Sequence, residues 1–175
     1  MSQNPAINNG FVAKLDKCRA DGKKTEQIFE RICDDNSLLY FRATKEEDIA
    51  HHIDYWVAKC KDDVSGKYYS VDVKGGRYEN RIWVEIKNVK GELGWLYGRA
   101  YYIAFHMADM GMFVMVRRES LREFVEGVVE KVYVRKHEAF HKLYRRSGRL
   151  DVLTLLSYDD IARIDGVSYY SSKAI

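Results

Sequence analysis

In Tyr68-Tyr69-Ser70-Val71-Asp72-Val73-Lys74, the stretch that decides the fold, apolar and polar side chains alternate. A period of two residues is typical of a β-strand whose two faces meet different surroundings. The same alternation occurs at residues 53–57 and again at 81–87. These three segments are therefore predicted to be strands of one sheet.

The sheet is expected to continue beyond these strands. Two further strands are predicted at Tyr101–Met107 and Met112–Val116, and residues 108–111 between them are predicted to form a tight turn. Earlier in the chain, Leu38–Phe41 is interpreted as a short buried strand or a packed connection. The sequence thus predicts a sheet of about five strands.

Helices are expected before and after the sheet. Two Asx-Gly pairs, at 9–10 and 21–22, are turn signals, and the second introduces Lys23–Cys33, whose apolar residues repeat at helical spacing. A later apolar stripe predicts a helix that Ser120 could cap, and a second helix is predicted at His137–Tyr144. The fold class expected is α+β (mixed α/β).

Composition indicates one domain. The chain has 175 residues, of which 46% are hydrophobic and one is Pro, so a disordered or fibrous class is excluded. We expect a single domain over 1–175, with its core at about 22–118 and a basic helical C-terminal part at about 119–175. The sequence has neither an apolar run of about 18 residues nor the order of a signal peptide. A soluble, cytoplasmic protein without a membrane partner is expected.

The cysteines and the net charge narrow the chemistry only a little. Cys18, Cys33 and Cys60 are far apart and form no CxxC pair, so we expect reduced thiols rather than a zinc knuckle or a disulfide framework. The net charge of +3 permits a nucleic-acid partner without requiring one.

Chemically useful side chains gather on the middle strands. Asp72 and Lys74 lie two positions apart, so they project from the same face of their strand. If the preceding strand pairs with this one as a hairpin, Asp54 comes beside Asp72. Two neighbouring carboxylates repel each other, and a divalent cation would explain both. The alternative is an exposed ion pair of Asp72 and Lys74, with Asp54 as a strand-end cap.

The acidic residues and the lysine follow one another in an order that is similar to that of a known family. A helix opens with Gly22-x-x-x-Glu26, Asp54 follows, and then comes Asp72-Val73-Lys74-Gly75. This order resembles the PD-(D/E)xK nuclease superfamily, which includes restriction enzymes and Holliday-junction resolvases. In this sequence Ile53 precedes Asp54, where the pattern has Pro.

The resemblance implies a fold and an activity. It implies a restriction-endonuclease-like sheet and Mg²⁺- or Mn²⁺-dependent hydrolysis of DNA, by a monomer or a homodimer. Its catalytic residues would be Glu26, Asp54, Asp72 and Lys74, with Asp54 and Asp72 as metal ligands. Residues 91–98, Gly-Glu-Leu-Gly-Trp-Leu-Tyr-Gly, and the later Tyr144-x-Arg146-x-Gly148-Arg149-x-Asp151 also look similar to bacteriophage proteins with this core. The host cytoplasm would then be the compartment.

Two other motifs compete with this assignment. Glu85-Ile86-Lys87 is itself an ExK on a strand, so Glu85 is a candidate for an additional metal ligand. His137-Glu138-Ala139-Phe140-His141 has the HExxH spacing of a zinc-protease helix. Charged residues flank this second motif and no third ligand follows, which favours a basic surface helix over a zinc hydrolase.

Basic residues are concentrated in the last third of the chain, where tyrosines are interleaved with them. Such a patch suits contacts with the phosphate backbone, which add affinity without sequence specificity. A binder without catalysis, such as a phage accessory factor gripping DNA or a protein, is the alternative function. The residues expected to contact DNA are Arg135, Lys136, Lys142, Arg145, Arg146 and Arg149.

Overall fold

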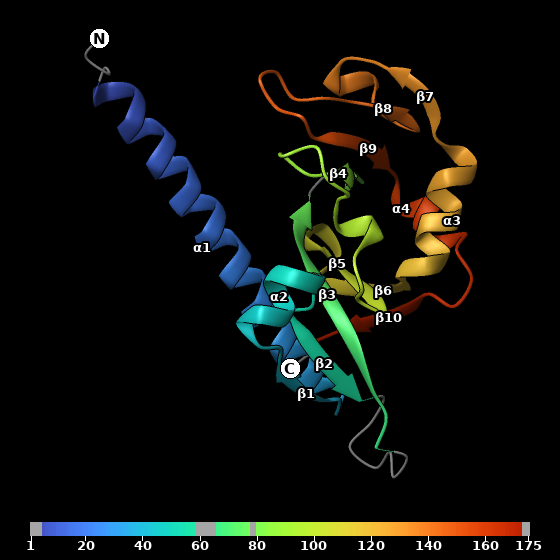
Figure 1. Ribbon diagram of the computed structural model, residues 1–175. Helices are drawn as coiled ribbons and strands as arrows, with labels where there is room; N and C mark the ends of the chain where they lie inside the picture. The colour runs from blue at the N-terminus through green and yellow to red at the C-terminus, as the bar shows by residue number, and fades with distance from the viewer. Residues whose placement is uncertain (1–4, 59–65, 78–79, 173–175) are drawn as a thin grey trace.

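The structure is a computed structural model that describes residues 5–58, 66–77 and 80–172 (Figure 1). Within them it contains four α-helices, three short 3-10 turns and ten strands, in a mixed α+β arrangement. In chain order the elements are α1 (Pro5–Asp35), β1 (Leu39–Arg42), α2 (Lys45–His51), β2 (Tyr55–Ala58), β3 (Tyr68–Arg77), β4 (Ile82–Lys87), η1 (Trp95–Tyr97), β5 (Tyr102–Met107), η2 (Ala108–Met110), β6 (Met112–Arg117), α3 (Arg118–Val128), β7 (Glu130–Tyr133), η3 (Lys136–Glu138), β8 (Lys142–Leu143), β9 (Val152–Leu156), α4 (Tyr158–Ala162) and β10 (Ser168–Ser171).

The main sheet has six strands in the order β1-β2-β3-β5-β6-β10. Strands β3 and β5 pair in parallel, and the other neighbours are antiparallel. The strands predicted in the middle of the chain are therefore present, with η2 as the turn between β5 and β6.

The fourth strand along the chain departs from the prediction, because β4 does not join the main sheet. It pairs instead with β9, and residues Ile82 and Leu156 are partners in that ladder. The reason lies in the parallel pairing of β3 with β5, since two parallel strands need a connection that crosses one face of the sheet. The segment that carries β4 and η1 is this crossover.

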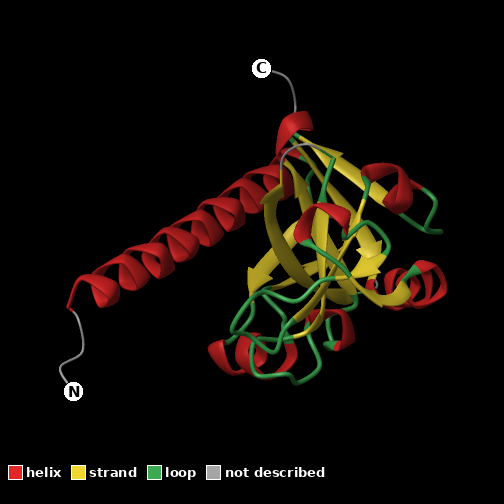
Figure 2. Cartoon of the chain, turned by 90° about the horizontal axis from the view of Figure 1, so that it is seen from above, coloured by secondary structure: helices red, strands yellow, loops and turns green. Residues whose placement is uncertain are grey.

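The two faces of the main sheet are covered by different elements (Figure 2). The last turns of α1 pack on one face, where Phe29 and Ile32 meet Val71 and Phe113. The crossover, α3 and α4 pack on the other face, where Leu96, Leu121 and Ile161 meet Ile103 and Val116. Because side chains alternate along β3, Val71 belongs to the α1 face and Asp72 faces the crossover.

Helix α1 is much longer than predicted. It begins at Pro5 and runs through both Asx-Gly pairs, so the turns predicted at 9–10 and 21–22 are wrong. A glycine inside a helix costs only about 1 kcal/mol, which the helix tolerates. Its first turns extend away from the rest of the chain (Figure 1). In the described residues no helix has both the length and the apolar character needed to cross a membrane.

The C-terminal part is not the helical extension that was predicted. It contains only α3 and the short α4 as α-helices, and its other elements are mainly strands. Strand β10 returns to pair with β6, so this part completes the main sheet. Helix α3 starts three residues earlier than predicted, because Arg117, and not Ser120, is at its N-cap. Of the cysteines, Cys33 is a buried free thiol, and Cys60 lies outside the described residues.

Candidate functional site

Three of the predicted site residues meet on the crossover face of β2 and β3. Asp54 immediately precedes β2, and its backbone N–H donates to the carbonyl of Val71 at 2.9 Å. This register places Asp54 opposite Asp72. Oδ2 of Asp54 accepts a hydrogen bond from the Val73 N–H at 2.7 Å, and Lys74 Nζ lies 2.6 Å from Oδ1 of Asp72. The hairpin thus brings two carboxylates and one ammonium group together.

The two carboxylates are incompletely compensated. Asp72 is 2% exposed, and with both acids ionised its buried Oδ2 has no hydrogen-bond donor among the described residues. Burial, and then the charge of Asp72, raises the pKa of Asp54 to about 7. Burial also raises the pKa of Asp72, although the charge of Lys74 opposes the rise. One lysine therefore does not offset the desolvation of both carboxylates.

Lys74 is held against an indole ring supplied by the crossover. Its Nζ lies 5.2 Å from the centre of the Trp95 ring, a distance at which a cation–π attraction operates. Gly94 allows Trp95 to come this close to β4, since a Cβ at position 94 would lie 2.5 Å from the backbone oxygen of Glu85. Gly98 is nearly as confined, with the backbone oxygen of Trp95 3.1 Å from its ideal Cβ position. Close packing therefore explains why residues 94 and 98 are glycines.

Two more ionisable side chains adjoin the cluster. Burial raises the pKa of Glu85 while the charges of Lys74 and Arg146 oppose the rise, and the Trp95 backbone N–H donates to the Glu85 carboxylate. Burial, and then the charge of Lys74, lowers the pKa of His52. Sequence reasoning had found Glu85 through its ExK motif. It did not select His52, because nothing in the pattern shows that the left-handed C-cap of α2 lies near Lys74.

Glu26 does not join this group. Its carboxylate pairs with Arg42 at 2.7 Å, and Arg42 also pairs with Glu30 at the same distance. The hydroxyl of Tyr55 donates to Glu30, and the Tyr55 side chain belongs to the core on the α1 face. Glu26 therefore forms its ion pair on the opposite face of the sheet from Asp72. Glu30 takes part in this network through Arg42 and Tyr55.

No protein-family model, curated protein or solved structure matches this chain.

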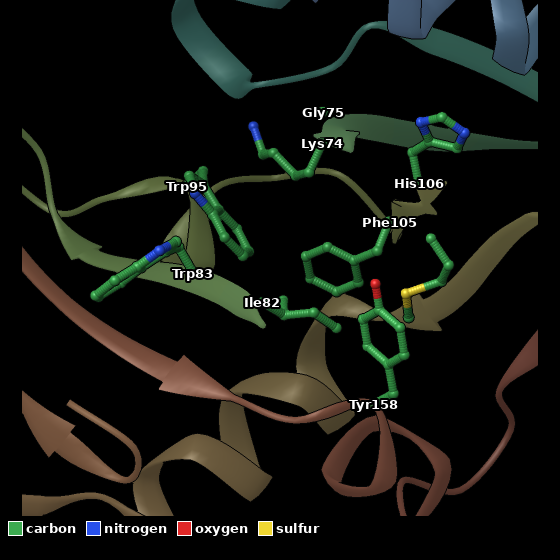
Figure 3. Close-up of a pocket in the computed structure, with 9 residues that line it drawn as sticks. Lys74, Gly75, Ile82, Trp83, Trp95, Phe105, His106 and Tyr158 are labelled. Carbon is green, nitrogen blue, oxygen red and sulfur yellow. The ribbon is translucent and has the colours of Figure 1, made fainter. Parts of the chain in front are cut away.

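Two hollows lie next to Lys74 and Glu85. The smaller, of about 90 Å³, is lined by Lys74, Trp83, Trp95 and hydrophobic side chains of β5 (Figure 3). The larger is a cleft of about 330 Å³, which Trp83 and Trp95 also line. The two hollows adjoin at these two tryptophans, and Lys74 lines the smaller one; together they are called the aromatic groove below.

The HExxH segment is not a zinc helix. It was predicted to lie in a helix over 137–144, but the structure has the 3-10 turn η3 followed by β8. His141 adopts a left-handed backbone conformation, and its Nε2 lies 2.9 Å from Oδ2 of Asp160. The zinc motif needs an α-helix, in which two histidines four residues apart lie one above the other on the same face, and this segment is not an α-helix.

The six basic residues predicted to contact DNA lie in different environments. Arg146 forms an ion pair with Asp151, whose carboxylate is fully buried. Arg145 lies over the ring of Tyr133 at 5.1 Å, and Lys142 Nζ is 4.0 Å from Glu130. Arg145 is exposed, as are the three remaining members, Arg135, Lys136 and Arg149. Only part of the predicted patch therefore presents cations to solvent.

Proposed function

We propose that this chain is a metal-dependent nuclease that hydrolyses DNA phosphodiester bonds, built on a variant of the restriction-endonuclease-like fold. The convergence of Asp54, Asp72 and Lys74 carries this proposal. A hairpin that follows a helix and bears an acid and then an Asp-x-Lys pair is also the order of the superfamily that the sequence resembles. The departure is Glu26, which is paired with Arg42.

The donor atoms suit Mg²⁺ or Mn²⁺. Both ions prefer carboxylate oxygens, and Mg²⁺ sites commonly use one or two carboxylates with water completing the shell. Asp72 has a buried oxygen to which no group in the described part of the chain donates, and Asp54 lies opposite Asp72. In the described residues no group of three or more His, Cys, Asp or Glu side chains is arranged to hold a metal. Asp54 and Asp72 would hold the ion with water completing its shell, and Glu85, the additional ligand expected from the sequence, is not grouped with them closely enough to be a third protein ligand.

The roles of the side chains follow from their charges and positions. A bound Mg²⁺ or Mn²⁺ ion supplies Lewis-acid activation of the phosphate and of a water molecule. Lys74 is partly exposed and faces the groove, so its ammonium group can offset charge that develops on the phosphate in the transition state. The Val73 N–H orients the Asp54 carboxylate. Burial by the crossover limits the access of bulk water, which strengthens each of these interactions.

The test is cleavage of plasmid, linear duplex and single-stranded DNA by the purified protein in Mg²⁺ or Mn²⁺. Cleavage is expected with either ion and is expected to stop in EDTA and in Asp72→Asn. The matched control is Asp165→Asn, which removes an exposed carboxylate at a distance from the hairpin and should leave the rate unchanged. Equal cleavage by Asp72→Asn and the unmodified protein would refute the assignment.

The second candidate is a DNA- or protein-binding protein without catalysis. The diversion of Glu26 to Arg42, and the direct ion pair between Asp72 and Lys74, favour it. This candidate predicts salt-sensitive DNA binding without turnover. Calorimetric titration with Mg²⁺ and Mn²⁺ separates the two functions, because only the nuclease requires a binding heat that disappears in Asp72→Asn.

A further inference from the structure

The cleft of about 330 Å³ has a composition that neither the carboxylates nor Lys74 requires. One wall is Trp83 of β4 and another is Tyr144, which follows β8. Their ring centres are 5.6 Å apart, and the ring planes make an angle of 47°. Both rings are half-buried, so part of each is exposed to solvent. The two rings therefore contact each other, and their exposed parts form one aromatic side of the cleft.

Charged groups flank these rings. Lys136 is exposed and lines the cleft, and Arg146 lines it while paired with Asp151. Glu85 lines the cleft on the side where its carboxylate senses the charges of Lys74 and Arg146. A phosphate is repelled by Glu85 and attracted by the cations around it. The favourable arrangement therefore has phosphates near Lys74 and Lys136 and an uncharged planar group between them.

The cleft adjoins the smaller hollow, which Lys74 of the proposed reaction site lines. Trp83 and Trp95 line both the cleft and the smaller hollow that contains Lys74. In Figure 3 the two indole rings and Lys74 lie along the same side of that hollow. A phosphate beside Lys74 would accordingly have its attached nucleoside within reach of Trp83.

We infer that the cleft is a stacking subsite for one unpaired nucleobase, so that the substrate of the proposed nuclease is single-stranded nucleic acid or an unpaired strand at a junction. This inference rests on the proposed function for its reaction. Aromatic rings beside a cationic groove are the usual way in which proteins hold single strands, since every base offers a π-face. A cleft of this size is at the lower end of the ~300–1,000 Å³ typical of small-molecule pockets. It admits one nucleoside, whereas the bases of a duplex stay within the helical stack.

The experiment measures binding in EDTA, by the fluorescence anisotropy of labelled oligo(dT), oligo(U) and a DNA duplex of the same length. The unmodified protein is expected to bind a single strand more tightly than the duplex. Trp83→Ala and Tyr144→Ala should each weaken single-strand binding on the order of tenfold. Trp83→Phe keeps an aromatic face and should retain most of the affinity. Tyr169→Ala, which removes an exposed ring on β10, is the matched control and should change nothing.

The outcomes separate this inference from the proposed function. Unchanged single-strand affinity in both folded alanine variants, or tighter binding of the duplex, overturns the stacking subsite. If Trp83→Ala does not fold, the test is instead the quenching of tryptophan fluorescence in the unmodified protein by oligo(dT). Absence of quenching also overturns the subsite. Stacking-dependent binding without metal-dependent cleavage refutes the nuclease alone. The two oligonucleotides distinguish DNA from RNA as the source of the strand.

Discussion

Replacing Asp54 with Asn should make the metal-free protein more stable at neutral and higher pH. Burial and the charge of Asp72 raise the pKa of Asp54 from 3.8 to about 7 in the folded chain. Because the folded pKa exceeds the unfolded one, the stability linked to this proton is complete below about pH 4 and is lost as the pH rises to about 7. A shift of about three units corresponds to about 4 kcal/mol.

The expected effect is smaller than this limit, because Asp54 is partly accessible to solvent and titrates together with Asp72. Above about pH 7.5 we expect the free energy of unfolding of Asp54→Asn to exceed that of the unmodified protein by about 2 kcal/mol, which corresponds to an increase in Tm of about 4–8 °C for a chain of this size. Below about pH 4 the two proteins should differ little, since asparagine resembles the protonated acid and keeps an oxygen for the Val73 N–H.

Thermal unfolding followed by circular dichroism in EDTA, across this range of pH, is the assay. The control is Asp165→Asn, whose exposed carboxylate should give a difference in Tm that does not change with pH. A Tm difference between Asp54→Asn and the unmodified protein that is constant with pH would show that Asp54 is not buried against Asp72 as described. Saturating Mg²⁺ should raise the Tm of the unmodified protein at high pH and leave Asp54→Asn nearly unaffected, since only ionised carboxylates bind the ion well.

Two further substitutions test the surroundings of the site by urea unfolding. Gly94→Ala should lower the free energy of unfolding by about 1–3 kcal/mol, because the new Cβ would lie 2.5 Å from the Glu85 backbone oxygen. The control is Gly127→Ala in α3, where a Cβ would meet no atom within 4 Å, so the free energy of unfolding should stay unchanged or rise. Equal effects of the two substitutions would contradict the close packing of the crossover. Arg146→Met should lower the free energy of unfolding by about 3–5 kcal/mol, because it leaves the fully buried Asp151 without its ion-pair partner. The double variant Arg146→Met/Asp151→Leu should recover most of this free energy. An Arg146→Met variant as stable as the unmodified protein would show that Asp151 is not buried as a charge.

The local pattern of the sequence was sufficient for the strands that carry the site. Alternation in β2 and β3 predicted both strands and placed Asp72 and Lys74 on one face. This works because the direction of successive side chains is a property of the extended backbone and needs no information about partners. The pairing of Asp54 with Asp72 needed only the assumption of a hairpin, which the register confirms.

Patterns that depend on distant partners were misleading. The apolar stretch at β4 looks like any other strand of the sheet, yet it pairs with β9, about 70 residues later in the chain. Residues 137–144 carry a helical motif, yet the segment forms a 3-10 turn and then a short strand beside β7 and β9, and His141 contacts Asp160. Propensity is a weak local preference that tertiary packing overrides.

The sequence by itself determined the identity and order of Asp54, Asp72 and Lys74, because strand periodicity assigns each side chain to a face. Only the tertiary structure decided what surrounds them. The parallel pairing of β3 with β5 forces the connecting segment across the site face, and this crossover brings Glu85 and Trp95 to Lys74. Glu26 lies on the other face of the sheet, where it pairs with Arg42. Contacts between residues far apart in the chain depend on how the elements pack, and a local sequence pattern does not encode that packing.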